Sequence, residues 1–83
     1  MLLEDENILS VIFNSTDQKI QHPIICKNTE KFSDVESRLY KVYPEYLESE
    51  NYFLTKGKKV NRFKTIEQNN IKNSDIITLE KFE

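Results

Sequence analysis

Few side chains in this sequence are of the types that carry out chemistry. His22 is the only histidine and Cys26 the only cysteine. A catalytic or metal-binding histidine needs partners at a suitable spacing, and neither residue has them here. Gly57 is the only glycine, so a glycine-rich phosphate loop cannot be built either. The sequence therefore predicts no enzyme, no metal site and no cofactor, with His22 solvated or hydrogen-bonded and Cys26 a small core residue.

A run of basic residues is the strongest charge feature of the chain. No acidic residue interrupts it, and such a run can bind the phosphates of nucleic acid or an acidic protein. However, no pattern of base-stacking aromatic residues accompanies it, and the net charge of -2 gives no general attraction to nucleic acid or membranes. We expect a solvated hairpin and loop, and keep a basic binding patch as an alternative. Its residues are Lys56, Lys58, Lys59, Arg62 and Lys64.

Length and composition predict one small globular domain. The chain has 83 residues, of which 37% are hydrophobic and 31% charged. A single cysteine cannot form an internal disulfide, which favours a reducing compartment, cytoplasmic or nuclear. No leader and no long apolar run is present, so secretion and membrane insertion are not expected. We expect a monomer, with residues 1–7 as a flexible lead-in and residues 8–83 as the domain.

Alternating apolar residues and turn signals predict the strands. Residues 8–13 and 20–26 have the composition of a hairpin, and Pro23 confines the second strand to a sheet edge because proline lacks an N–H. Residues 52–56 form a third strand, and Gly57 supplies the positive φ that the following turn needs. A short strand follows this turn, and residues 76–82 form the last strand.

Helical spacing is clearest between the second and third strands. Phe32, Val35 and Leu39 recur at positions i, i+3 and i+7 within a charged segment, which predicts a helix over residues 32–43. Pro44 ends this helix. Residues 65–68 have the spacing of a second, shorter helix start, and Asn70 is suited to the left-handed conformation that ends its turn.

This order of elements resembles the ubiquitin-like β-grasp family over residues 8–82. The resemblance implies an α+β fold, in which a mixed five-stranded sheet carries one main helix across it, with a short second helix. The helix stripe, the turn at Gly57 and the alternation of Ile77 and Leu79 all match this family in spacing. The core that it implies consists of Leu9, Val11, Phe13, Ile24, Cys26, Phe32, Val35, Leu39, Phe53, Val60, Ile66, Ile71, Ile77 and Leu79.

Two departures from the family bear on function. Conjugated members end in Gly-Gly, whereas this sequence ends Glu80-Lys81-Phe82-Glu83, so we expect a non-conjugated type. In the apolar patch by which ubiquitin is bound, Leu54 keeps the central position, but Thr16, Thr78 and Glu80 stand where apolar or imidazole side chains would be. Because burying an unpaired carboxylate is unfavourable, ordinary ubiquitin receptors should bind poorly.

The resemblance implies a binding surface rather than an active site. We expect a non-enzymatic interaction module of a larger intracellular protein, whose partner is a ubiquitin-pathway component or a neighbouring domain of the same chain. A Ras-association-like module that pairs its edge strand with a small GTPase is the alternative, and the first strand lacks the basic residues of a PB1 domain. The predicted contact residues lie on the outer sheet face and are Ile12, Tyr52, Leu54, Ile76 and Thr78.

Overall fold

The computed structural model describes residues 6–82 of the chain. In order, these form β1 (Ile8–Ser15), β2 (Gln21–Lys27), α1 (Phe32–Val42), the 3-10 helix η1 (Pro44–Glu48), β3 (Asn51–Thr55), β4 (Lys58–Lys59) and β5 (Ile76–Lys81). The predicted strands and main helix are confirmed. The predicted flexible segment, residues 1–7, lies largely outside the described residues and stays a prediction.

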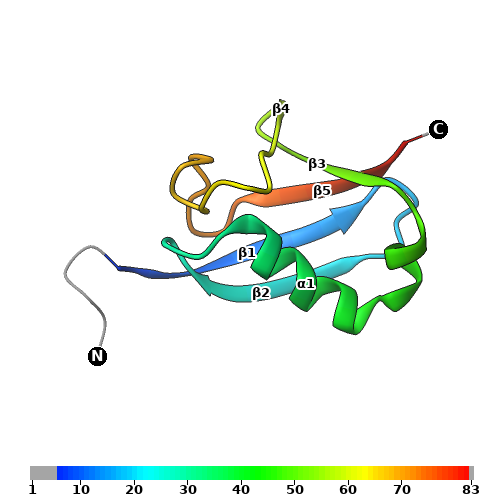
Figure 1. The fold of residues 1–83 in the computed structure, drawn as a ribbon, viewed down its shortest axis with the longest axis horizontal. Coiled ribbons are helices and arrows are strands. Elements are labelled where there is room, and N and C mark those ends of the chain that lie inside the picture. Colours follow the sequence, from blue (N-terminus) through cyan, green and yellow to red (C-terminus); the bar gives the residue numbers. More distant parts are fainter. Residues whose placement is uncertain (1–5, 83) are drawn as a thin grey trace.

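The strands form one mixed sheet in the order β2-β1-β5-β3-β4. β1 and β5 run parallel at its centre, and the other neighbouring strands are antiparallel. Figure 1 shows α1 lying across one face of this sheet. Gly57 joins β3 to β4 with a φ of 75°, as predicted. The architecture is the α+β arrangement that the sequence predicts, with β2 and β4 as its two edges.

The core lies between the inner face of the sheet and the apolar stripe of α1. Phe53 is at its centre: its ring centroid is 5.8 Å from that of Phe13 and 5.0 Å from that of Phe32, both edge-to-face. Such pairs add about 0.5–1.5 kcal/mol each beyond the burial of their surface. Val35 and Leu39 complete the buried stripe of the helix. The predicted helix orientation is therefore confirmed.

The predicted core differs from the observed one at three residues. Val60 was predicted to be buried but is only half-buried against the core. Ile20 and Tyr46 are fully buried and were not predicted. Ile20 precedes β2 and its N–H donates to the Ser15 hydroxyl at 3.0 Å, which fixes it inward. Tyr46 belongs to η1, so its burial depends on where that turn packs.

The predicted position of the second helix was wrong. Thr65 and Gln68 do make the reciprocal capping hydrogen bonds, each of 3.0 Å, that their spacing indicates. The residues that follow form only turns, which end at Asn70 with the predicted positive φ of 57°. The short helix is instead η1, where Pro44 stands in the first turn.

The loop after β4 closes the start of α1. The Phe32 N–H donates to the Lys64 carbonyl at 2.9 Å, and the Ser33 N–H donates to the Arg62 carbonyl at 3.0 Å. Glu36, one turn into the helix, is buried and pairs with the Arg62 guanidinium at 3.2 Å. Part of the basic run is therefore fixed against the helix.

Candidate functional site

Exposed apolar side chains gather on the outer face of the sheet, which points away from α1. Strand pairing places Ile12 between Pro23 on β2 and Ile76 on β5. Ile8 and Ile25 lie on the same face of β1 and β2 by alternation. The four isoleucines are between 36% and 70% exposed. We call these five residues (Ile8, Ile12, Pro23, Ile25 and Ile76) the outer apolar face.

The outer apolar face extends further towards β2 than the sequence predicts. Ile12 and Ile76 were predicted, but Ile8, Pro23 and Ile25 were not. The signal that could have found Ile25 was present, because Ile24 and Cys26 were placed in the core and Ile25 must then point outward. Exposed apolar residues are normal singly, but a contiguous group on one sheet face is typical of an interaction surface.

Leu54 and Thr78 continue the same face on β3 and β5. Thr78 pairs with Leu54 on one side and with Asn14 on the other, and follows Ile76 by two residues on β5. Both Leu54 and Thr78 are half-buried. The structure therefore brings four of the predicted contact residues next to one another.

A shallow hollow lies within this face and contains a hydrogen-bond acceptor. Its lining includes Ile12, Pro23 and Ile76, together with Asn14 and His22. The side-chain oxygen of Asn14 is shielded from solvent and has no hydrogen-bond partner among residues 6–82. Because a buried acceptor without a hydrogen-bond partner is unfavourable, a partner that donates a hydrogen bond here would relieve it.

The fifth predicted residue, Tyr52, belongs to a separate group. It pairs with Glu80 on β5, and its ring lies 4.6 Å from that of Phe82. The Lys59 ammonium is 5.2 Å from the centroid of each ring. Tyr52 thus lies beyond Leu54, with aromatic and cationic neighbours rather than the isoleucines.

The predicted basic residues do not share one role. Lys56 pairs with Asp75 at 3.0 Å, and Arg62 pairs with Glu36 at 3.2 Å. Lys58, Lys59 and Lys64 are exposed and make no ion pair among the described residues. Whether these residues form a binding patch stays a prediction.

No protein-family model and no curated protein sequence matches this chain. Among solved structures, a de novo design based on ubiquitin matches it with a TM-score of 0.76, covering 89% of this chain and 88% of the design, at 14% sequence identity. The fold is ubiquitin-like. At this identity the similarity establishes the β-grasp architecture, as the sequence predicts, and leaves function to be argued from surfaces.

In this ubiquitin-like domain the two potentially reactive side chains, His22 and Cys26, both belong to β2, four positions apart along the strand. Cys26 is buried, and burial raises the pKa of its thiol although Arg38 opposes the shift. The His22 ring lies 5.9 Å from the Tyr43 ring, edge-to-face.

Within residues 6–82, no group of three or more histidine, cysteine or acidic residues is arranged to hold a metal ion. No helix within the same range has the length and apolar character needed to cross a membrane.

Several backbone groups at the free edge of β2 are unavailable to an added strand. The Ile12 N–H donates to the Asp75 carbonyl, so the backbone groups of Ile12 point towards β5. In an antiparallel pair of this kind the backbone groups of the opposite residue, Pro23, point away from β1 to the open edge. Because proline has no N–H, the edge lacks a donor at this position. At the same edge, the Ile25 carbonyl accepts a hydrogen bond from Arg38 at 2.9 Å. The predicted edge position of Pro23 is confirmed.

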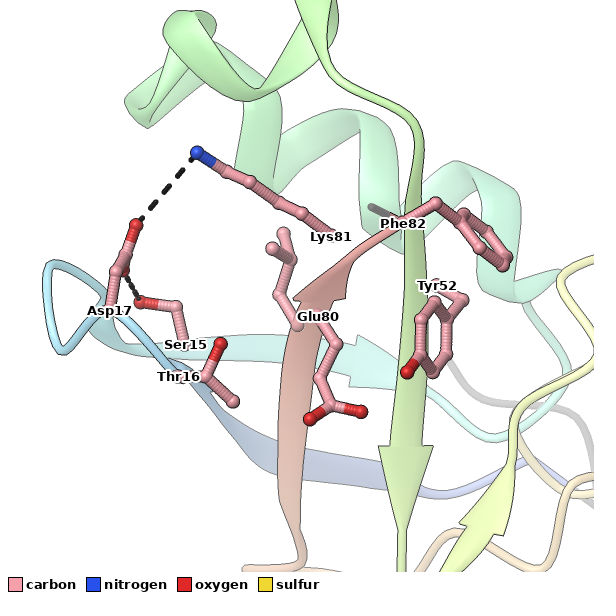
Figure 2. A pocket seen from close by; sticks show the side chains of 8 residues that line it. Ser15, Thr16, Asp17, Tyr52, Glu80, Lys81 and Phe82 are labelled. Atoms are coloured by element: carbon pink, nitrogen blue, oxygen red, sulfur yellow. Dashed lines mark hydrogen bonds and ion pairs between the residues drawn. The ribbon is translucent and has the colours of Figure 1, made fainter.

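A second hollow, shown in Figure 2, lies where the β1–β2 turn approaches the end of β5. The Asp17 carboxylate accepts hydrogen bonds from the Ser15 hydroxyl, from the Tyr46 hydroxyl at 2.7 Å and from the Lys19 N–H at 3.1 Å. Lys81 lies 4.0 Å away. These interactions, led by the hydrogen bond from Ser15, lower the pKa of Asp17 from 3.8 to about 2. Asp17 thus links the turn to η1 and β5.

The lowered pKa of Asp17 predicts a loss of stability in acid. Folding favours the ionised carboxylate of Asp17, which therefore stabilises the folded state. This stabilisation is fully present above the unfolded pKa of 3.8 and is lost as the pH falls towards the folded pKa of about 2. We expect Asp17→Asn to destabilise the domain at neutral pH and to reduce the further loss between these pH values. Urea unfolding at a series of pH values measures both effects. The exposed Glu48→Gln is the matched control, and an unchanged acid dependence in Asp17→Asn would contradict the assignment.

Proposed function

We propose that this ubiquitin-like domain is a non-enzymatic interaction module of a larger intracellular protein, which docks a protein partner through the outer apolar face together with Leu54 and Thr78. The observation that best supports the proposal is the parallel pairing of β1 with β5, which sets the exposed Ile12 beside the exposed Ile76. The partner is a ubiquitin-pathway component or a neighbouring domain of the same polypeptide. A role without conjugation remains an expectation from the sequence.

Magnitudes indicate what kind of complex this face can form. Burying a fully exposed isoleucine contributes about 1.5–3 kcal/mol. Ile12 and Ile76 would contribute less to binding, because part of each side chain is already covered in the free domain. Association itself costs at least about 4 kcal/mol in lost freedom of motion. The isoleucines alone therefore support weak binding, and a donor that reaches the Asn14 oxygen would add specificity.

Edge-strand pairing with a small GTPase is the alternative that we favour less. An added strand needs free N–H and C=O groups along β2. Pro23 offers no donor there, the Ile25 carbonyl is bound by Arg38, and the Lys27 N–H donates to the Glu30 carboxylate at 2.9 Å. Pairing at this edge would have to break those hydrogen bonds first.

The double variant Ile12→Ala/Ile76→Ala tests docking on the outer apolar face. We expect it to weaken partner binding by about tenfold or more, because the few residues that dominate binding cluster near the centre of an interface, where the proposal places Ile12 and Ile76. Proteins captured by the immobilised domain from cells that express it would be identified, and their affinities for purified domain variants measured by titration. Leu47→Ala, which removes an exposed apolar side chain from η1, is the control and should bind as the wild type does.

Amide NMR on the same complex separates the candidate surfaces. Shifts centred on Ile12, Thr78 and Ile76 support the proposal, whereas shifts along β2 on adding a GTP-loaded GTPase support strand pairing. Equal affinity of the double variant and the wild type for every captured partner would refute docking on this face.

A further inference from the structure

A groove beside β4, at the opposite edge of the sheet from β2, combines aromatic and basic side chains. We call it the β4 groove, and its lining includes Tyr52, Lys59, Val60, Arg62, Phe63 and Phe82. Three of its eight lining residues are aromatic. It is formed by β3, β4, the loop that follows β4, and the residue after β5.

Two of the three aromatic side chains of the β4 groove, those of Phe63 and Phe82, are exposed although their backbone is held in place. Phe63 is 80% exposed, more than any other large apolar residue of the described chain. Its N–H donates to the Asn61 side-chain oxygen at 3.0 Å, and the Lys64 N–H donates to the Asn61 carbonyl at 3.1 Å. This loop also caps α1, so its backbone is already ordered before any ligand binds. A ligand that packs on Phe63 would therefore pay little entropy for ordering the loop.

The charge of the β4 groove is positive. The run from Lys56 to Lys64 contains no acidic residue, and only Lys56 and Arg62 have ion-pair partners, Asp75 and Glu36. The cations that have no ion pair among the described residues are Lys58, Lys59 and Lys64.

No acidic side chain of the described residues lines the groove. Glu80 pairs with Tyr52 from β5, whereas Lys59 approaches the Tyr52 ring from β4, on the other side of β3. Figure 2 shows the Glu80 carboxylate on the β5 side of Tyr52, with the Phe82 ring beside Tyr52. The aromatic surface is therefore bordered by the Lys59 ammonium on its β4 side.

From this arrangement we infer that the β4 groove binds an acidic protein segment that carries an aromatic or aliphatic anchor residue. The anchor packs against Phe63, Phe82 and Tyr52, and a carboxylate beside it meets Lys59. The exposed Lys58 and Lys64, which do not line the groove, attract the acidic segment at longer range. The complementary charges increase the rate of encounter, and the anchor supplies most of the affinity. This inference does not depend on the outer apolar face, none of whose five residues lines the groove.

Side chains rather than backbone pairing must provide this recognition. β4 contains only Lys58 and Lys59, so an added strand would find a very short edge. A segment that binds here consequently needs the combination of anchor and acidic residues, and neither alone should suffice.

Selection from a phage-displayed random peptide library, with the full chain as bait, tests the inference. We expect the enriched peptides to contain aspartate or glutamate on both sides of one aromatic or aliphatic residue. The most enriched peptide is then synthesised with a fluorescent label, and its affinity is measured by anisotropy. A version with its acidic residues replaced by the corresponding amides should bind at least about tenfold more weakly, a difference of about 1.4 kcal/mol.

Variants of the exposed lining residues locate the site. Phe63→Ala should weaken the peptide by about tenfold and Lys59→Gln by a smaller factor that shrinks as salt is added. Val42→Ala and Lys72→Gln, which remove an exposed apolar and an exposed basic residue elsewhere, should leave the affinity unchanged. Amide spectra of each variant show that the fold is kept.

Three results would overturn the inference. One is a selection that yields no peptides or peptides without acidic residues. Another is wild-type affinity in both Phe63→Ala and Lys59→Gln. The third is displacement of the peptide by a single-stranded oligonucleotide at equal concentration, which would identify the groove as a nucleic-acid site instead.

Discussion

Replacing Phe53 with alanine should lower the free energy of unfolding by about 3–5 kcal/mol, the cost of removing a buried phenylalanine. Phe53 is 1% exposed and its ring contacts those of Phe13 and Phe32, so its loss leaves a cavity between the sheet and α1. For a domain of this size such a loss is a large part of the total stability. Urea unfolding followed by circular dichroism measures it.

Phe63→Ala is the matched control for this experiment. It removes the same side chain from a position that is 80% exposed, and should change stability by less than about 0.5 kcal/mol. Similar unfolding midpoints for the two variants would show that Phe53 does not occupy the centre of the core.

Leu39→Ala should cost about 2–5 kcal/mol, because Leu39 is fully buried on the face of α1 that packs against the sheet. Val42, three residues later on the same helix, is 50% exposed. Val42→Ala therefore keeps the helix and removes little buried surface, which isolates the contribution of packing from that of helix propensity. Thermal and urea unfolding of both variants measure the two losses of stability. A larger loss in Val42→Ala than in Leu39→Ala would show that the orientation of α1 is wrong.

The strands and the main helix were predictable from sequence because their signals are local. Alternation around Val11 and Phe13, and the spacing of Phe32, Val35 and Leu39, each require one buried face and therefore also fix which side chains enter the core. Gly57 and Asn70 were predictable for a different reason, since few residues adopt a positive φ at low cost.

The misplaced short helix and the missed core residues depend on contacts that are distant in sequence. Thr65 and Gln68 cap a turn as their spacing indicates, but the turn is not continued as a helix. Tyr46 becomes fully buried only because η1 packs beside the β1–β2 turn, where its hydroxyl meets Asp17. Nothing in the neighbouring sequence indicates that contact.

The candidate surfaces were predictable in part for the same physical reasons. The alternation of β1 and β5 identifies Ile12 and Ile76, whereas their adjacency follows from the strand order of the whole sheet. The division of the basic run likewise required the positions of Asp75 and Glu36, which pair with Lys56 and Arg62 across the fold. The aromatic surroundings of Lys59 could not be deduced from its local sequence.

The occupied edge of β2 has a consequence for self-assembly. Exposed isoleucines next to an open strand are the combination from which edge-to-edge aggregation and amyloid growth begin. Here Pro23 withholds a donor, and further along the strand Arg38 binds the Ile25 carbonyl and Glu30 binds the Lys27 N–H, so a second molecule finds no regular ladder to extend. The exposed isoleucines can thereby lie next to this edge without the edge serving as a template for polymerisation.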